Sequence, residues 1–118
     1  MPYVALWFRA FVFTVLMELL VLQRLFRSTR GSTVRRGLLV VYANLASHPC
    51  VWFVFPLLPV SYALQLVFAE LWAFASEALF YAVAFEDLAP RRAVWGSLLA
   101  NVVSLTGGLM LRHTLDWV

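Results

Sequence analysis

The stretch YVALWFRAFVFTVLMELLVLQRLFRSTRGSTVRR (residues 3–36) decides the fold of this chain. Residues from 3 to about 26 form an almost uninterrupted apolar run, and a helix needs about 20 such residues to cross a hydrocarbon core. A turn of Arg, Ser, Thr and Gly follows, and it contains no acidic residue. An apolar helix followed by a basic turn is typical of a membrane span that ends at a cytoplasmic surface.

Three further apolar segments follow, at about residues 37–57, 60–85 and 93–111. Hydrophobic residues make up 64% of the 118-residue chain and charged residues 13%, whereas soluble domains have about 25% charged residues. A soluble protein of this size could not bury so much apolar surface. The sequence therefore predicts an all-α integral membrane protein, a single domain over residues 1–118 with four transmembrane helices and the lipid bilayer as its solvent.

Arginines indicate how the helices are oriented. All nine basic residues are Arg, and seven of them lie in or beside two of the connections. These seven are Arg24, Arg27, Arg30, Arg35, Arg36, Arg91 and Arg92. Because cytoplasmic loops are enriched in Arg and Lys, both connections are predicted to be cytoplasmic, and both termini to lie on the other side of an inner or plasma membrane. Basic charge placed between apolar runs is interpreted as a topology signal, and nucleic acid is excluded as a partner.

The two halves of the chain resemble each other. The matched polar pairs are Glu18 with Glu77, Arg35 with Arg92, Asn44 with Asn101, and Ser47 with Ser104. Polar residues are rare in these segments, so their pairing predicts two helical-hairpin repeats, at about residues 3–57 and 60–111. Two helices per repeat insert both hairpins the same way round, which makes the repeat parallel.

Four of the matched polar residues are expected to share one depth in the membrane. With a rise of about 1.5 Å per residue, Glu18 and Asn44 lie roughly 12 Å from the cytoplasmic ends of their helices, and Glu77 and Asn101 roughly 13 Å. A carboxylate facing lipid at this depth is expensive, so both Glu are predicted to face the bundle interior. The layer is either a site for a cation or protons, or a set of hydrogen bonds between helices.

A second group of polar residues lacks this symmetry. His48 lies four residues after Asn44 on the same helical face, and Pro49 predicts a kink beside it. Glu70 and Glu77 share a face of the third segment. Neither His48 nor Glu70 has a counterpart in the other half, which favours a specialised site formed by His48, Glu70 and Glu77. The alternative is a neutral His that satisfies the kink. The spacing does not match a metal motif, and neither a metal nor a cofactor is predicted.

Small residues line one face of the last segment. Ser97, Ser104 and Gly108 share this face with Asn101, and small residues at such spacing let helices approach closely. They are interpreted as helix-packing residues, either within the chain or at a dimer interface.

Three classes of function fit these features. The first is an accessory or assembly subunit that binds other membrane helices, favoured by the small size and the small-residue face. The second is a homo-oligomeric transporter or a proton or cation pathway that uses the polar layer. The third is a membrane-embedded enzyme using His48 with Glu70 or Glu77, and no catalytic residue is assigned for it. A membrane-protein partner or a homo-oligomer is expected in the first two classes.

Overall fold

The structure of the protein, a computed structural model, describes residues 2–115, and all regular structure in this range is helical. The elements are α1 (Pro2–Leu25), α2 (Thr33–Phe53), the short 3-10 helix η1 (Phe55–Leu57), α3 (Tyr62–Ala84) and α4 (Pro90–Leu115). Over these residues, four helices are long and apolar enough to cross a membrane. The prediction of an all-α chain with four apolar helices is confirmed, and these helices fit a multi-pass membrane protein.

Both ends of α2 and both ends of α4 differ from the predicted boundaries by three or four residues, and α4 continues to Leu115 rather than ending near residue 111. α2 begins at Thr33 rather than near residue 37, because the Ser32 hydroxyl caps it by accepting a hydrogen bond from the Arg35 N–H at 3.1 Å. α4 begins at Pro90 rather than near residue 93, because proline is favoured at the first position of a helix. α2 ends at Phe53, and the chain then tightens into η1, which contains Pro56. α2 itself continues through Pro49, where a kink stays a prediction.

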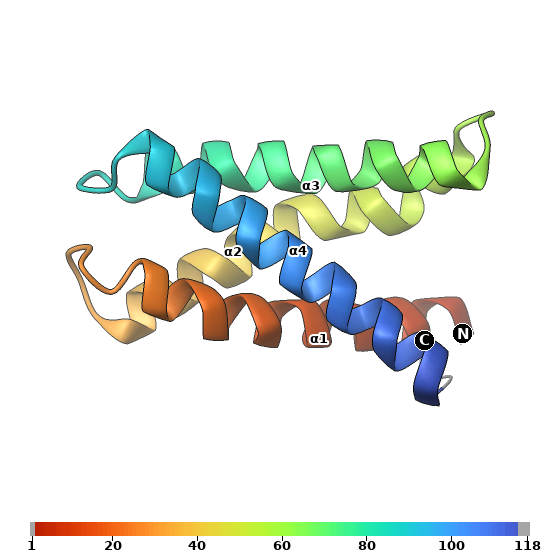
Figure 1. Cartoon of the computed structure of the whole chain (residues 1–118), viewed down its shortest axis with the longest axis horizontal. Helices are drawn as coiled ribbons and strands as arrows, with labels where there is room; N and C mark the ends of the chain where they lie inside the picture. The colour runs from red at the N-terminus through yellow and green to blue at the C-terminus, as the bar shows by residue number, and fades with distance from the viewer. Residues whose placement is uncertain (1, 116–118) are drawn as a thin grey trace.

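The helices form a four-cornered bundle in which each helix contacts two neighbours (Figure 1). α1 and α3 each contact both α2 and α4, and α4 crosses the view diagonally in front of the other helices. The connections over residues 26–32 and 85–89 lie at one end, called here the loop end. The N- and C-terminal ends of the described chain and the turn between α2 and α3 lie at the opposite end, called here the terminus end.

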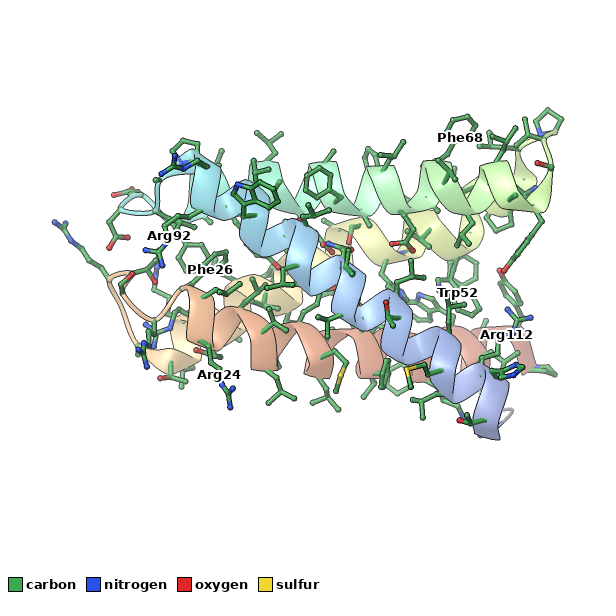
Figure 2. All side chains as sticks on the ribbon, in the orientation of Figure 1. Arg24, Phe26, Trp52, Phe68, Arg92 and Arg112 are labelled. Atoms are coloured by element: carbon green, nitrogen blue, oxygen red, sulfur yellow. The ribbon has the colours of Figure 1, made fainter. Side chains whose placement is uncertain are left out.

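The distribution of polar and apolar side chains is the reverse of that in a soluble protein. Large apolar side chains cover the outside of the bundle (Figure 2). Leu79 and Val83, for example, are 68% and 72% exposed. The buried polar side chains are Glu18, Thr29, Asn44, Ser47, His48, Glu77, Ser97, Asn101 and Ser104. Such an arrangement suits a lipid solvent, because lipid favours apolar side chains on the outside.

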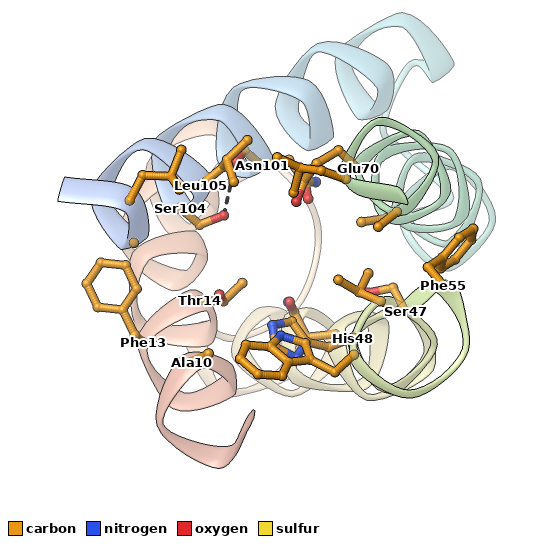
Figure 3. Close-up of a pocket in the computed structure, with 18 of the residues that line it drawn as sticks. Ala10, Phe13, Thr14, Ser47, His48, Phe55, Glu70, Asn101, Ser104 and Leu105 are labelled. Atoms are coloured by element: carbon orange, nitrogen blue, oxygen red, sulfur yellow. Dashed lines mark hydrogen bonds between the residues drawn. The ribbon is translucent and has the colours of Figure 1, made fainter. Parts of the chain in front are cut away.

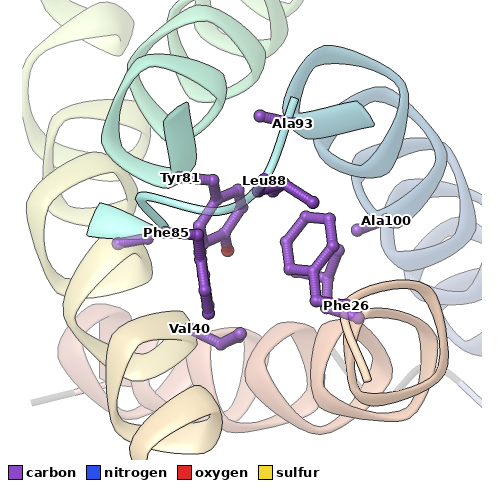
Figure 4. Close-up of a cluster of buried hydrophobic side chains, with 9 residues drawn as sticks. Phe26, Val40, Tyr81, Phe85, Leu88, Ala93 and Ala100 are labelled. Atoms are coloured by element: carbon purple, nitrogen blue, oxygen red, sulfur yellow. The ribbon is translucent and has the colours of Figure 1, made fainter. Parts of the chain in front are cut away.

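An apolar cluster closes the interior at the loop end (Figure 4). This loop-end core consists of Leu22, Phe26, Val40, Ala43, Tyr81, Phe85, Leu88, Ala93 and Ala100. The rings of Phe26 and Phe85 are 5.2 Å apart, so the ends of α1 and α3 meet through aromatic contact. Gly96 lets α4 approach this contact, because a Cβ at that position would lie 2.7 Å from the Phe26 ring.

Candidate functional site: a buried polar layer below an open cavity

The first hairpin contains a buried Glu–Asn pair. The Asn44 Nδ2 donates a hydrogen bond of 2.7 Å to Glu18 Oε2 and a second of 3.0 Å to the Val40 carbonyl, one turn back in α2. Both Glu18 and Asn44 are 0% exposed. The carbonyl contact fixes the rotamer of the amide, so that the amide points at the carboxyl group of α1.

The second hairpin contains a pair with the same geometry. The Asn101 Nδ2 donates a hydrogen bond of 2.5 Å to Glu77 Oε2 and another of 2.8 Å to the Ser97 carbonyl, again one turn back in its own helix. Both residues are buried. Each hairpin therefore joins its two helices by one carboxyl–amide contact, while the sequence repeat itself stays a prediction.

The serines break the symmetry of the two pairs. The Ser47 hydroxyl donates to Glu77 Oε1 at 2.8 Å, and this bond joins α2 of the first hairpin to α3 of the second. The matched Ser104 hydroxyl donates instead to the Asn101 carbonyl of its own helix at 3.1 Å. As a result, both oxygens of Glu77 have a donor, whereas Glu18 Oε1 has none.

Several buried polar atoms in and beside this layer have no hydrogen-bond partner. They are Glu18 Oε1, Asn44 Oδ1, His48 Nδ1 and the Tyr81 hydroxyl. Such orphan atoms are rare in native interiors, and each calls for a bound proton, water or ion. Glu18 and Glu77 are also close enough for their charges to interact. Two neighbouring buried carboxylates repel each other, so keeping both of them ionised in the layer would be costly.

A cavity of about 500 Å³ lies between the helices on the terminus side of the layer (Figure 3). Glu77, Asn44 and Asn101 line its inner end, and all four helices contribute to its walls. Glu70 and His48 also line it. The cavity is open, and the loop-end core lies on the other side of the polar layer.

The structure brings most of the predicted polar residues to one place. Asn44, His48, Glu70, Glu77 and Asn101 all line the cavity. The depth pattern of the sequence had predicted a common layer only for Asn44, Glu77 and Asn101, together with Glu18. Glu18 belongs to the layer through Asn44 but does not line the cavity.

The predicted small-residue face of α4 points into the bundle. The Ser97 hydroxyl donates to the Phe74 carbonyl of α3 at 3.0 Å, while Ser104 and Gly108 line the cavity. A Cβ on Gly108 would lie 3.9 Å from the Phe13 ring of α1. Ser97 therefore contacts α3, and Gly108 faces α1 of the same chain.

Two of the predicted topology arginines have an additional structural role. The Arg35 Nη2 donates to the carbonyl of Ala84, which ends α3, at 3.2 Å. The Arg92 Nη2 donates to the carbonyl of Leu25, which ends α1, at 3.1 Å. Each hairpin thus supplies a guanidinium that caps a helix of the other hairpin, and cations are favourable at helix C-termini.

The remaining topology arginines divide into two groups. Arg36 bonds to Gln23 and to carbonyls of its own connection, within the loop end. The side chains of Arg24, Arg27, Arg30 and Arg91 make no hydrogen bond to any of residues 2–115, although the Arg30 backbone N–H donates to Asp87 Oδ2 at 2.7 Å.

Sequence reasoning missed two residues next to the layer. Tyr81 is fully buried one turn after Glu77, and its hydroxyl lies within electrostatic reach of both Glu18 and Glu77. Its position four residues after Glu77 was the available signal, since such spacing places both side chains on one helical face. Thr14, one turn before Glu18, lines the cavity wall on α1.

Comparisons with other proteins add no functional assignment. Among residues 2–115, no group of three or more His, Cys, Asp or Glu side chains is arranged to hold a metal ion. The chain has no match among protein-family models, curated proteins or solved structures.

Proposed function

We propose that the four helices span a membrane and that the protein binds protons or another cation at the polar layer and moves them across the membrane. The observation that carries this proposal is the position of Glu77, a buried carboxyl group at the inner end of an open cavity. An intramembrane carboxyl group is costly, and such groups typically mark ion or proton pathways.

The route begins at the terminus end. A cation that enters the cavity meets Glu70 before it reaches Glu77, because Glu70 lies two helical turns nearer to that end of α3. Glu18 lies beyond, next to Glu77 and away from the cavity. With the Arg-rich connections in the cytoplasm, the cavity opens to the non-cytoplasmic side of an inner or plasma membrane.

The loop-end core makes this a one-sided pathway in the conformation described. No polar side chain other than Tyr81 belongs to the core. A cation therefore crosses only after the loop end rearranges, which is the alternating-access behaviour of transporters. Four helices enclose little space, so the proposal includes a homo-oligomer in which two chains share the pathway.

Flux through purified protein in liposomes tests the proposal. Proton entry is followed with an internal pH-sensitive dye under an imposed gradient of pH or of potassium. We expect Glu77→Gln to lower the protein-dependent flux by about ten-fold or more, because it removes the charge that holds the cation. Glu86→Gln is the matched control, since Glu86 is exposed at the loop end, away from the cavity. Equal flux in wild type and Glu77→Gln refutes the proposal.

An accessory subunit that binds other membrane helices is the second candidate. The apolar outer surface supports it, for instance Leu71, Leu79 and Val83 of α3, because such a surface can contact a helix of another protein as well as lipid. Purification in a gentle detergent followed by mass spectrometry separates the two candidates. A stoichiometric second membrane protein together with absent flux favours the subunit, whereas flux from a homo-oligomer excludes it.

A further inference from the structure

Polar groups at the inner part of the cavity lack hydrogen-bond partners. Asn44 Oδ1 and His48 Nδ1 are buried without a partner, and both residues line the cavity. The half-buried Glu70 carboxylate also makes no hydrogen bond or ion pair with any of residues 2–115. A ligand that suits this end of the cavity therefore brings positive charge and several N–H donors.

The outer part of the cavity is apolar and aromatic. Trp52, Phe55 and Tyr62 line it near the terminus end, and the His48 ring stacks on Trp52 with 6.4 Å between ring centroids. The volume of about 500 Å³ lies within the range of about 300–1,000 Å³ that is usual for small-molecule sites. Aromatic walls bind the apolar body of a ligand and also attract cations.

We propose that the cavity binds a protonated primary or secondary amine that carries an aromatic or aliphatic body. This inference rests on the proposed function and names the class of its substrate. The ammonium group lies at the inner end, where the Glu70 carboxylate accepts its N–H groups and, together with Glu77, neutralises its charge. The apolar body lies against Trp52 and Phe55.

Two features distinguish this ligand from other cations. A quaternary ammonium has no N–H and cannot donate a hydrogen bond to the Glu70 carboxylate, which has no donor among residues 2–115. A divalent metal needs a cluster of ligands that residues 2–115 do not provide. Arg112 lines the cavity near the end of α4, so the basic charge lies at the mouth and the acidic charge inside. This separation of charge along the cavity orients the ammonium group toward the inner end.

Binding of three matched compounds tests the inference. Isothermal titration of the purified protein in detergent uses 2-phenylethylamine, its N,N,N-trimethyl analogue and the neutral 2-phenylethanol, with empty micelles as the blank. We expect the primary amine to bind about ten-fold or more tightly than either analogue, the ratio expected when one charge-assisted hydrogen bond is lost. Glu70→Gln should weaken amine binding by a similar factor, while Glu86→Gln leaves it unchanged.

The outcomes separate this inference from the function on which it rests. Equal or tighter binding of the trimethyl analogue, or absence of amine binding to the wild type, overturns the inference. If proton flux in liposomes still depends on Glu77, the proposed function survives and its cation is a proton or an inorganic ion. If the amine binds as expected but no flux is found, the ligand class stands and the transport function fails. The comparison of ligands uses wild-type protein, so it does not depend on the folding of a variant.

Discussion

The two asparagines of the polar layer should differ in their contribution to stability, although each donates to a glutamate. In Asn44→Ala, Glu18 loses its one hydrogen-bond donor, because Glu18 Oε1 already has no partner. Glu18 is fully buried and does not line the cavity, so cavity water does not reach it directly. In Asn101→Ala, Glu77 keeps the Ser47 hydroxyl as a donor and faces the cavity, where water can replace the lost amide.

The expected difference follows from these contacts. A buried group left without any partner costs about 1–3 kcal/mol, whereas loss of one replaceable hydrogen bond costs about 0.5–1.5 kcal/mol. Both variants delete the same side-chain atoms, so their transfer and cavity contributions largely cancel. We therefore expect Asn44→Ala to lower the free energy of unfolding by about 1 kcal/mol more than Asn101→Ala does.

Unfolding in mixed micelles measures this difference. The protein is titrated with sodium dodecyl sulfate, and helix content and tryptophan fluorescence are followed for the wild type and both variants under the same conditions. Equal destabilisation by the two variants, or a larger effect of Asn101→Ala, would refute the reasoning. Either result would mean that Glu18 has a partner, such as a buried water, equivalent to the one that Ser47 gives Glu77.

Three further predictions concern α4 and the loop end. Gly96→Ala should destabilise the bundle by about 1–2 kcal/mol, because its Cβ would overlap an aromatic ring of the loop-end core. Gly37→Ala is the control, since its Cβ would meet no atom closer than 3.5 Å. It should be neutral or stabilising in the same titration with sodium dodecyl sulfate. Arg92→Gln should lower the free energy of unfolding by about 1 kcal/mol through loss of the cap on α1, and Arg91→Gln should lower it by less. Equal losses in the two variants would show that the cap is not stabilising. In a variant without the native cysteine, Ser104→Cys should react with a water-soluble thiol reagent and Ala100→Cys should not, and equal reactivity would contradict a cavity that stops at the polar layer.

The number and approximate positions of the helices could be predicted because they depend on run length and hydropathy alone. The common layer of Glu18, Asn44, Glu77 and Asn101 could be predicted as well, since depth depends only on helical rise. The predicted starts of α2 and α4 lie too late in the sequence, because hydropathy does not reflect the cap by Ser32 or the favourable first-turn Pro90. Such errors are local and leave the depth of each polar residue almost unchanged.

Contacts between the hairpins could not be predicted in the same way. Ser47 and Ser104 occupy matched positions, yet one bonds to a glutamate of another helix and the other to its own backbone. The choice depends on how each helix is rotated and inclined against its neighbours, and the periodicity of one helix does not contain that information. The cavity is a product of the same inclinations, so it could not be predicted either. The caps by Arg35 and Arg92 could not be predicted, because the positive-inside rule already explains both arginines and the sequence carries no separate signal for a cap.

The reciprocal caps by Arg35 and Arg92 hold the two hairpins together at the loop end. Each cap is a side-chain bond to a backbone carbonyl at an exposed surface, so water can take its place and each bond costs only about 1 kcal/mol to break. Both caps join one hairpin to the other, and so does the contact between Phe26 and Phe85 beneath them. If the hairpins moved apart as rigid bodies, the two caps would release together, and the aromatic contact would then be the last barrier between the polar layer and the loop end. The bonds that hold the two hairpins together at the loop end and the aromatic side chains that close the interior there would thus come from the same few residues.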